Sequence, residues 1–217
     1  MFFEYGERET EYLAQKDKRL GSAIRQIGHI NREADPDLFA AVVHHIIGQQ
    51  ISTAAQATIW KRLTDTLGTV TPDSLTELGR ERLQQIGTTY KKADYILDFA
   101  QQVRQGTLDL DGLWSLSNEE VIRELTKLKG VGVWTAEMIL IFCMQRPDVV
   151  SFGDLAILRG MRMLYRHRQI DRARFERYRN RYSPYGTVAS LYLWAIAGGA
   201  ICELTDPAEK KRKGRAV

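Results

Sequence analysis

The sequence has little cysteine and no long apolar segment, and each shortage excludes a class of protein. Two cysteines, Cys143 and Cys202, are too few for a four-cysteine iron–sulfur cluster. Both lie in apolar stretches, so we expect buried thiols and a reducing cytoplasm. No run of roughly 18 apolar residues is present to span a membrane. The N-terminus is charged from Glu4 onward, unlike a secretory signal.

Alternation of apolar and polar residues, the pattern of a half-buried strand, is also missing, as are internal repeats and low-complexity linkers. With 44% hydrophobic residues and five prolines, the chain is expected to be globular. Apolar residues recur at helical spacing along residues 7–27 and 90–105. Signals for further helix starts lie at Asp35-Pro36, at Ser52 or Thr53, at Thr71-Pro72 and at Ser117. These patterns predict an all-α protein of about nine or ten helices in two lobes.

The formal charge of +4 comes from the tail, because residues 209–217 carry five basic residues and one acid. Inside the chain, nine arginines lie between Arg159 and Arg181 against only Asp171 and Glu176. This block is suited to a phosphate backbone. It is equally consistent with solvated helix faces on which charges pair one turn apart.

A tight glycine turn joins two helices in "LKGVGVWTA", residues 128–136. The first helix is expected to end near Lys129, and an apolar second helix to begin near Gly132. Gly130 and Gly132 permit backbone angles that other residues find strained. The turn gathers amides at the start of the second helix, where an anion is favoured, so it is suited to binding phosphate. An ordinary helical hairpin, with glycines for geometry alone, is the alternative.

Three blocks together resemble the helix-hairpin-helix (HhH-GPD) DNA glycosylase superfamily. They are the hairpin followed by "VVSFGDLAILRG", the segment "DPDLFAAVVHHIIGQQIS" at residues 35–52, and "IGTTYKKA" at residues 86–93. The second and third are similar to its AlkA-like branch, the 3-methyladenine DNA glycosylases II. The resemblance covers residues 35–199 and indicates a short form without the N-terminal β domain. The loop before Asp154 lacks the proline that is often present in the family.

The resemblance implies a two-lobed all-α fold with the active site in the cleft between the lobes. Residues 1–35 would form an N-terminal helix that packs with the C-terminal lobe. Residues 36–150 would form the helical core lobe, with the hairpin at 117–145. Residues 151–205 would form the C-terminal helical lobe with the catalytic loop, and residues 206–217 a disordered basic tail.

The resemblance assigns catalysis to Asp154, whose carboxylate would stabilise the positive charge that develops on the sugar. Taken alone, the position of Asp154 favours a simpler role, capping a helix over residues 155–165. Trp134 stands where strand-nicking members of the superfamily carry a lysine nucleophile, so no AP-lyase activity is expected. The expected walls of the base pocket are Trp134, Trp194, Tyr90 and Phe152.

Further contacts are implied for the hairpin and for the loop after Gly48. The DNA contacts expected at the hairpin are Gly130, Gly132, Val133 and Thr135. Gln50 is the expected wedge that fills the hole left by the base, with Gln49 and Ile51 as alternatives. Lys92 would contact phosphate or be solvated. The family hairpin also binds a monovalent cation, so we expect structural Na⁺ or K⁺ at the main-chain carbonyls of Thr126, Leu128 and Val131, and no cofactor for catalysis.

The function implied is a monofunctional DNA glycosylase that removes alkylated purines from duplex DNA and leaves an abasic site. A glycosylase for deaminated or mismatched bases, or a DNA-binding module without activity, is the alternative. We expect a monomer in the cytoplasm, associated with the nucleoid and not with a membrane. The adjacent pair His44 and His45 lacks the partners of a metal site.

Overall fold

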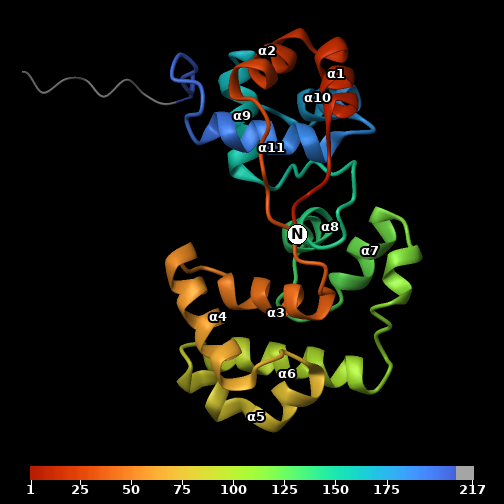
Figure 1. Ribbon diagram of the computed structural model, residues 1–217, viewed down its shortest axis with the longest axis vertical. Helices are drawn as coiled ribbons and strands as arrows, with labels where there is room; N and C mark the ends of the chain where they lie inside the picture. Colours follow the sequence, from red (N-terminus) through yellow and green to blue (C-terminus); the bar gives the residue numbers. More distant parts are fainter. Residues whose placement is uncertain (209–217) are drawn as a thin grey trace, which may run out of the picture. The chain divides into compact units, whose positions relative to one another are not determined.

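The computed structural model describes residues 1–208 and is all-α, as predicted (Figure 1). The described residues form eleven α-helices and one short 3₁₀ helix, with no strand beyond an isolated bridge between Phe2 and Glu33. They divide into two compact units. The first unit comprises Met1 and residues 34–144, and the second comprises residues 2–33 together with the chain from residue 145 onward.

The first unit contains seven helical segments. These are α3 (Leu38–Gly48), α4 (Thr53–Leu67), α5 (Pro72–Gln85), α6 (Tyr90–Arg104), η1 (Gly112–Ser115), α7 (Asn118–Leu125) and α8 (Val133–Phe142). Its core is built on α3 and α8, whose residues are mostly buried, and on stacked Phe39 and Phe99, with ring centroids 4.9 Å apart. Side-chain caps begin several of these helices where the sequence predicted them, at Ser52, Thr71 and Ser117.

The second unit joins the N-terminal segment to the C-terminal part of the chain. Its helices are α1 (Glu7–Lys16), α2 (Lys18–Ile27), α9 (Leu155–Tyr165), α10 (Arg172–Tyr182) and α11 (Gly186–Ala197). Helix α11 is almost wholly buried and packs along α9. The two helices approach closely at Gly160, where a Cβ atom would lie 2.2 Å from the carbonyl oxygen of Leu193. Glycine is therefore required at this position of α9.

The prediction of a single helix over residues 7–27 is wrong, because the helix is interrupted at Asp17. This residue has extended backbone angles, and its Oδ1 accepts hydrogen bonds from the amides of Arg19 and Leu20, both at 3.0 Å. The helical spacing of apolar residues continues across this interruption, so the sequence pattern gave no sign of it. The number of helices is consequently higher than the predicted nine or ten.

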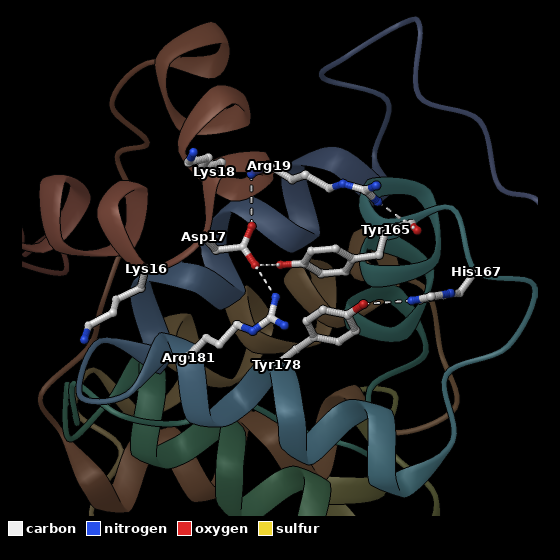
Figure 2. Close-up of a pocket in the computed structure, with 8 residues that line it drawn as sticks. All are labelled: Lys16, Asp17, Lys18, Arg19, Tyr165, His167, Tyr178 and Arg181. Atoms are coloured by element: carbon white, nitrogen blue, oxygen red, sulfur yellow. Dashed lines mark hydrogen bonds and ion pairs between the residues drawn. The ribbon is translucent and has the colours of Figure 1, made fainter.

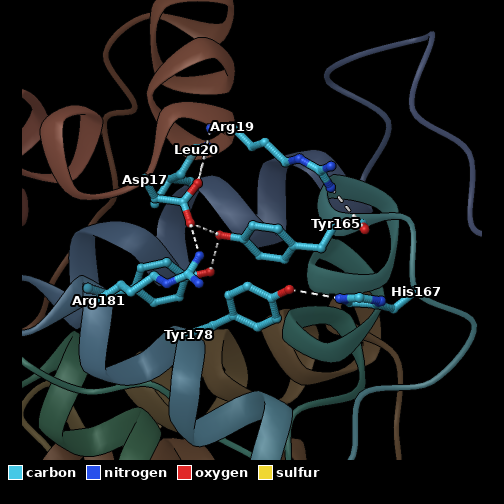
Figure 3. A network of polar contacts seen from close by, with 8 residues as sticks. Asp17, Arg19, Leu20, Tyr165, His167, Tyr178 and Arg181 are labelled. Atoms are coloured by element: carbon cyan, nitrogen blue, oxygen red, sulfur yellow. Dashed lines mark hydrogen bonds and ion pairs between the residues drawn. The ribbon is translucent and has the colours of Figure 1, made fainter.

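Asp17 also joins the helices of the second unit, as Figure 3 shows. Its Oδ2 accepts the Tyr165 hydroxyl at 2.9 Å and an Arg181 nitrogen at 3.2 Å. The Tyr165 hydroxyl lies 2.7 Å from that of Tyr182, which is fully buried. Burial, together with the neighbouring Tyr182 and Asp17, raises the pKa of Tyr165 well above its usual value. Burial raises the pKa of Tyr182 as well, so both phenols of the network stay protonated.

The two cysteines differ, which corrects one expectation. Cys143 is buried, and burial raises the pKa of its thiol to about 12. Cys202 is exposed, since it lies in the turn that follows α11 and not in an apolar helix. Among the described residues, no helix has the length and apolar character needed to cross a membrane.

The basic tail expected at residues 206–217 is described only at its start. Asp206 is buried and its carboxylate binds the Arg162 guanidinium, with Nε 2.9 Å from Oδ1. The chain is thus fixed to α9 at this residue. Residues 209–217, which carry the basic cluster, lie outside the described residues.

We predict that Asp17→Ala lowers the free energy of unfolding by roughly 3 kcal/mol, because it removes a helix cap and leaves a buried hydroxyl network without its acceptor. Asp171→Ala is the matched control, since Asp171 caps α10 through one amide and is exposed. The control should lose about 1 kcal/mol. Urea unfolding of both variants measures the difference, and equal losses would show that the network adds nothing to the cap.

Candidate active site and DNA-binding hairpin

The hairpin forms as the glycine pattern predicted, with α7 ending before Thr126 and α8 beginning after Gly132. The turn closes with the Val131 amide donating to the Leu128 carbonyl at 3.1 Å. Gly130 has φ +83°, and a Cβ atom there would lie 2.4 Å from the Tyr95 ring. Gly130 is therefore required both by its backbone and by its neighbour.

Gly132 does not have the strained backbone that the sequence suggested. Its φ is −95°, which any residue adopts, and a Cβ atom would meet nothing within 4 Å. The residue is exposed and begins α8 without a side-chain cap. Among the described residues, nothing requires glycine at this position, and a methyl group would fit here.

The start of α8 presents apolar side chains at the surface of the first unit. Val133 is 56% exposed and Trp134 is 43% exposed. Thr135 differs, since it is only 5% exposed. The expectation that its side chain contacts DNA thus gains no support, whereas Val133 and Trp134 lie where such contacts are feasible. The carbonyls expected to bind a cation belong to this same turn, and that of Leu128 already accepts the Val131 amide.

The loop after α3 is fixed by two long polar side chains. The Gln49 amide nitrogen donates to the Gly130 carbonyl, which ties the loop to the hairpin. The Lys92 ammonium group donates to the carbonyls of Ile47 and Gln49 at 2.9 and 2.7 Å. Both carbonyls lie at the end of α3, where no helical donor follows. The structure therefore brings Gln49, Lys92 and the hairpin together within one unit.

Lys92 consequently has a role that the sequence did not suggest. Its ammonium group stabilises the C-terminal end of α3 through the carbonyls of Ile47 and Gln49. The contact between Lys92 and phosphate stays a prediction. Burial lowers the pKa of this group. Its position in the sequence gave no sign of this, because its carbonyl partners lie more than forty residues away.

Gln50 is the loop residue with the most unusual backbone. Its φ is +57°, which is rare for a residue other than glycine, and its side chain is exposed. Ile51 is also exposed, whereas the Gln49 side chain is partly buried and engaged with Gly130. Of the three wedge candidates, Gln49 is thus the one already committed to a structural contact.

The neighbouring histidines are held as neutral side chains. Burial lowers the pKa of His45 to about 4, and adjacent His44 acts in the same direction. The His44 ring packs edge-on against Trp60, and the described residues contain no group of three or more side chains suited to a metal ion. Tyr90 is exposed at the start of α6, and the Arg80 guanidinium lies 4.3 Å from its ring centre.

In the second unit, Asp154 caps α9 with the bounds that the sequence predicted. Its Oδ1 accepts the amides of Ala156 and Ile157, both at 2.9 Å. The residue is only 7% exposed. Two amide donors and the positive end of the helix dipole therefore face this carboxylate. Capping is thereby confirmed, and it is compatible with a catalytic role.

The loop that leads to Asp154 is held by two residues of α11 that the sequence analysis missed. The Val149 amide donates to the Thr187 hydroxyl at 3.1 Å, and the Ser190 hydroxyl donates to the Val149 carbonyl at 3.0 Å. Both side chains are fully buried. Two hydroxyl residues in an otherwise apolar helix were the signal, since buried hydroxyls need partners.

Phe152 and Trp194, the remaining predicted pocket residues, are partly buried against the core of the second unit. The Phe152 ring packs edge-on against Phe175 with centroids 5.0 Å apart, and the Arg172 guanidinium lies 5.0 Å from its centre. Phe152 is therefore mainly a packing residue. Trp194 lies in α11, beside the helix that Asp154 begins.

The arginine block divides into paired and unpaired members. Arg172 pairs with Glu176 one turn away, with 2.8 Å between Nε and Oε1. Arg159 and Arg162 meet Asp206. In the described part of the chain, no ion pair is found for four members, namely Arg166, Arg168, Arg177 and Arg179. The two explanations of the block, pairing along helices and surplus positive charge, therefore both apply.

Comparisons with known proteins agree with this geometry. Residues 43–184 match the family described as HhH-GPD superfamily base excision DNA repair proteins. The chain belongs to this superfamily. A solved DNA-3-methyladenine glycosidase from Bacillus halodurans has a TM-score of 0.82 and 33% identity, over 91% of this chain and 93% of that one. The resemblance inferred from the hairpin and the Asp154 loop is confirmed.

Two comparisons with Schizosaccharomyces pombe extend the likeness within the HhH-GPD superfamily. DNA-3-methyladenine glycosylase 1 is 27% identical over 209 residues, which cover 93% of this chain and 91% of that protein. A solved 3-methyladenine DNA glycosylase in complex with abasic DNA has a TM-score of 0.78 and 25% identity, over 91% of this chain and 99% of that one. Both alignments thus cover nearly the whole of each chain.

We predict that Lys92→Met lowers the free energy of unfolding by about 2 kcal/mol, because two carbonyls at the end of α3 lose a charged donor. Lys91→Met is the control, since Lys91 is exposed one residue earlier and makes only a distant contact with the Tyr95 ring at 5.8 Å. Thermal and urea unfolding provide the measurement. Unchanged stability of the Lys92 variant would mean that this lysine is a surface cation.

Proposed function

We propose that the protein is a monofunctional DNA glycosylase that hydrolyses the bond between deoxyribose and an alkylated purine, of the 3-methyladenine type, in duplex DNA. The product is an abasic site, which places the reaction at the start of base excision repair. The observation that carries the proposal is the buried Asp154 carboxylate at the start of α9, within a chain that matches 3-methyladenine glycosylases along nearly its whole length.

Asp154 is assigned the chemical step. Departure of the base leaves positive charge on the sugar, and a carboxylate held in place by amide donors stabilises that charge without having to reorganise. The same carboxylate orients the attacking water. An alkylated purine is already cationic and leaves without being protonated by the enzyme. One carboxylate is therefore enough for the reaction, and no separate general acid is needed. Position 134 holds a tryptophan and not a lysine nucleophile, which supports hydrolysis without strand cleavage.

Recognition of the base is assigned to exposed aromatic surface. Trp134 is exposed at the start of α8, where a flipped, electron-poor base can stack on it. Trp194 of α11 is the second proposed wall, and Tyr90 is a third. Gln50 is the proposed wedge, because its left-handed backbone and exposed side chain leave it uncommitted to the core.

Duplex DNA is bound by the hairpin in this proposal, and the protein acts on it as a monomer. Phosphate approaches the amides at the start of α8, next to exposed Gly132. The main-chain carbonyls of Thr126, Leu128 and Val131 are the residues that would hold Na⁺ or K⁺, which supplies positive charge beside that phosphate. Binding of this type is mostly electrostatic and weakens steeply with salt.

We predict that Asp154→Asn lowers base release by at least about a hundredfold while leaving DNA binding and stability nearly unchanged. Asparagine caps helices as well as aspartate does, so the variant removes the charge and keeps the cap. Asp171→Asn, which caps α10 in the same way, is the matched control and should excise normally. The measurement is release of 3-methyladenine from methylated duplex DNA, followed by alkali to reveal abasic sites.

The same assay can contradict each part of the proposal separately. Normal release by the Asp154 variant would remove Asp154 from the reaction. Strand breaks before alkali would contradict the monofunctional assignment. A wild-type protein that releases deaminated or mismatched bases, but no alkylated purine, would change the substrate. If it releases none of these, the protein binds DNA without catalysis.

We predict that Gly132→Ala lowers affinity for duplex DNA about tenfold, the loss expected for one phosphate hydrogen bond, with stability unchanged. A methyl group fits within the protein here, so the effect arises only if phosphate approaches this amide. Gly130→Ala should instead destabilise the fold by at least about 1 kcal/mol, because its backbone is left-handed and Tyr95 blocks the space. Fluorescence anisotropy and thermal unfolding measure the pair. Unchanged affinity of the Gly132 variant would place the phosphate elsewhere.

A further inference from the structure

A polar cavity of about 350 Å³ lies in the second unit, away from the proposed reaction centre. Figure 2 shows it between the junction of α1 and α2, the end of α9 and the end of α10. Asp154 begins α9, whereas the cavity begins at Tyr165, which ends it. Eleven residues of helix separate the two by roughly 16 Å. The cavity is therefore a separate site on the same unit.

Positive charge dominates the lining. Lys16, Lys18 and Arg19 are exposed, and within the described residues none of the three makes an ion pair. Arg19 uses one nitrogen to donate to the Tyr165 carbonyl at 3.0 Å, which fixes its guanidinium at the rim. Arg181 adds a fourth cation from the end of α10. Four cationic side chains from three helices thus line one small cavity.

The single acid in the lining, Asp17, is already occupied. Its Oδ1 accepts the amides of Arg19 and Leu20, and its Oδ2 accepts Tyr165 and Arg181. The residue is only 5% exposed. It therefore neutralises part of Arg181 from within and leaves the other three cations without a counter-charge. Because Asp17 takes the first amides of α2, an anion would have to be bound by side chains.

The aromatic residues of the lining offer no surface for a base or another flat ring. Tyr165 and Tyr178 are both buried and stack on each other, with centroids 3.8 Å apart. The Tyr178 hydroxyl lies 2.7 Å from Nε2 of His167, so its polar end is also engaged. What remains accessible is charge and hydrogen-bond donors, which suit a compact anion.

We propose that this cavity binds a phosphate group. Flexible lysine ammonium groups and a fixed guanidinium are the donors that proteins use for phosphate. The volume is at the low end of ligand sites, which fits one tetrahedral group and its water. Two sources share this chemistry, the backbone of a nucleic acid that reaches the far end of α9 and a free phosphate or phosphorylated small molecule.

His167 provides a reporter inside the cavity. Burial lowers the pKa of its ring, and Arg174, Arg19 and Arg177 lower it further, against the opposing effect of Asp171. A bound phosphate dianion adds negative charge beside the ring. It should therefore raise the pKa of His167 toward or above its ordinary value. The sequence has four histidines, so the ring protons of His167 can be resolved and assigned with a His167→Gln variant.

The first experiment titrates the full chain with inorganic phosphate at constant ionic strength and follows the His167 ring protons by NMR. We expect saturable shifts, together with the rise in the pKa of His167. Lys18→Glu should weaken phosphate binding by at least about fivefold, the effect of losing one close charge pair. Lys18 makes no hydrogen bond or ion pair among the described residues, so the variant should fold normally. Arg25→Glu, an exposed charge reversal on the same helix, should bind as the wild type does.

The second experiment repeats the titration with a short undamaged DNA duplex in place of phosphate. Shifts with inorganic phosphate alone support the proposal and identify a small-molecule source. Shifts with duplex, weakened by Lys18→Glu and not by Arg25→Glu, support it and identify nucleic acid. If neither probe moves the His167 signal, or if both variants weaken binding equally, the cavity is not a phosphate site. None of these outcomes depends on base excision.

Discussion

Each helix end leaves amides or carbonyls without a helical partner, and this constraint determines where polar chemistry lies in an all-helical protein. Asp154 satisfies the start of α9, and Lys92 satisfies the end of α3. Gly132 begins α8 without a side-chain cap and is exposed. Thus the proposed catalytic carboxylate, the loop that carries the wedge and the proposed phosphate contact all lie at helix termini. The apolar faces of the same helices fix these termini by packing into the cores.

Specific side-chain hydrogen bonds hold these helix termini and their loops in position. Buried Thr187 and Ser190 hydrogen-bond the loop that leads to Asp154, so the position of the carboxylate depends on α11 as well as on α9. Gln49 links the end of α3 to the Gly130 carbonyl, so the loop is tied to the hairpin. A glycosylase that must flip a base and hold it beside one carboxylate needs this kind of support, because small displacements of a reacting group are costly.

Local signals in the sequence predicted most of the fold. The caps at Ser52, Thr71 and Ser117 and the α9 cap at Asp154 all depend on near neighbours in the chain, and they are found where expected. Of the two hairpin glycines, only Gly130 has the left-handed backbone that was expected. Features that depend on distant partners were missed or misread. The break at Asp17 interrupts a continuous apolar pattern, Lys92 meets carbonyls of another helix, and Cys202 follows an apolar helix without joining its core. The chemical roles came from the resemblance to a family, since spacing alone described Asp154 as a cap.

Helix α9 connects the two proposals by its electrostatics. Its start carries Asp154 and its last turn carries Arg162, the arrangement that the helix dipole favours at both ends. The dipole explains the signs of these charges but not their surroundings. A capping aspartate can remain solvated, whereas Asp154 is buried. Stabilising one helix end likewise does not require cations from α1, α2 and α10 to line a single cavity. The burial of Asp154 and the cationic lining of the cavity are therefore the reasons for proposing roles beyond helix stability. The proposed partner is a sugar cation at the start of α9 and a phosphate at its end.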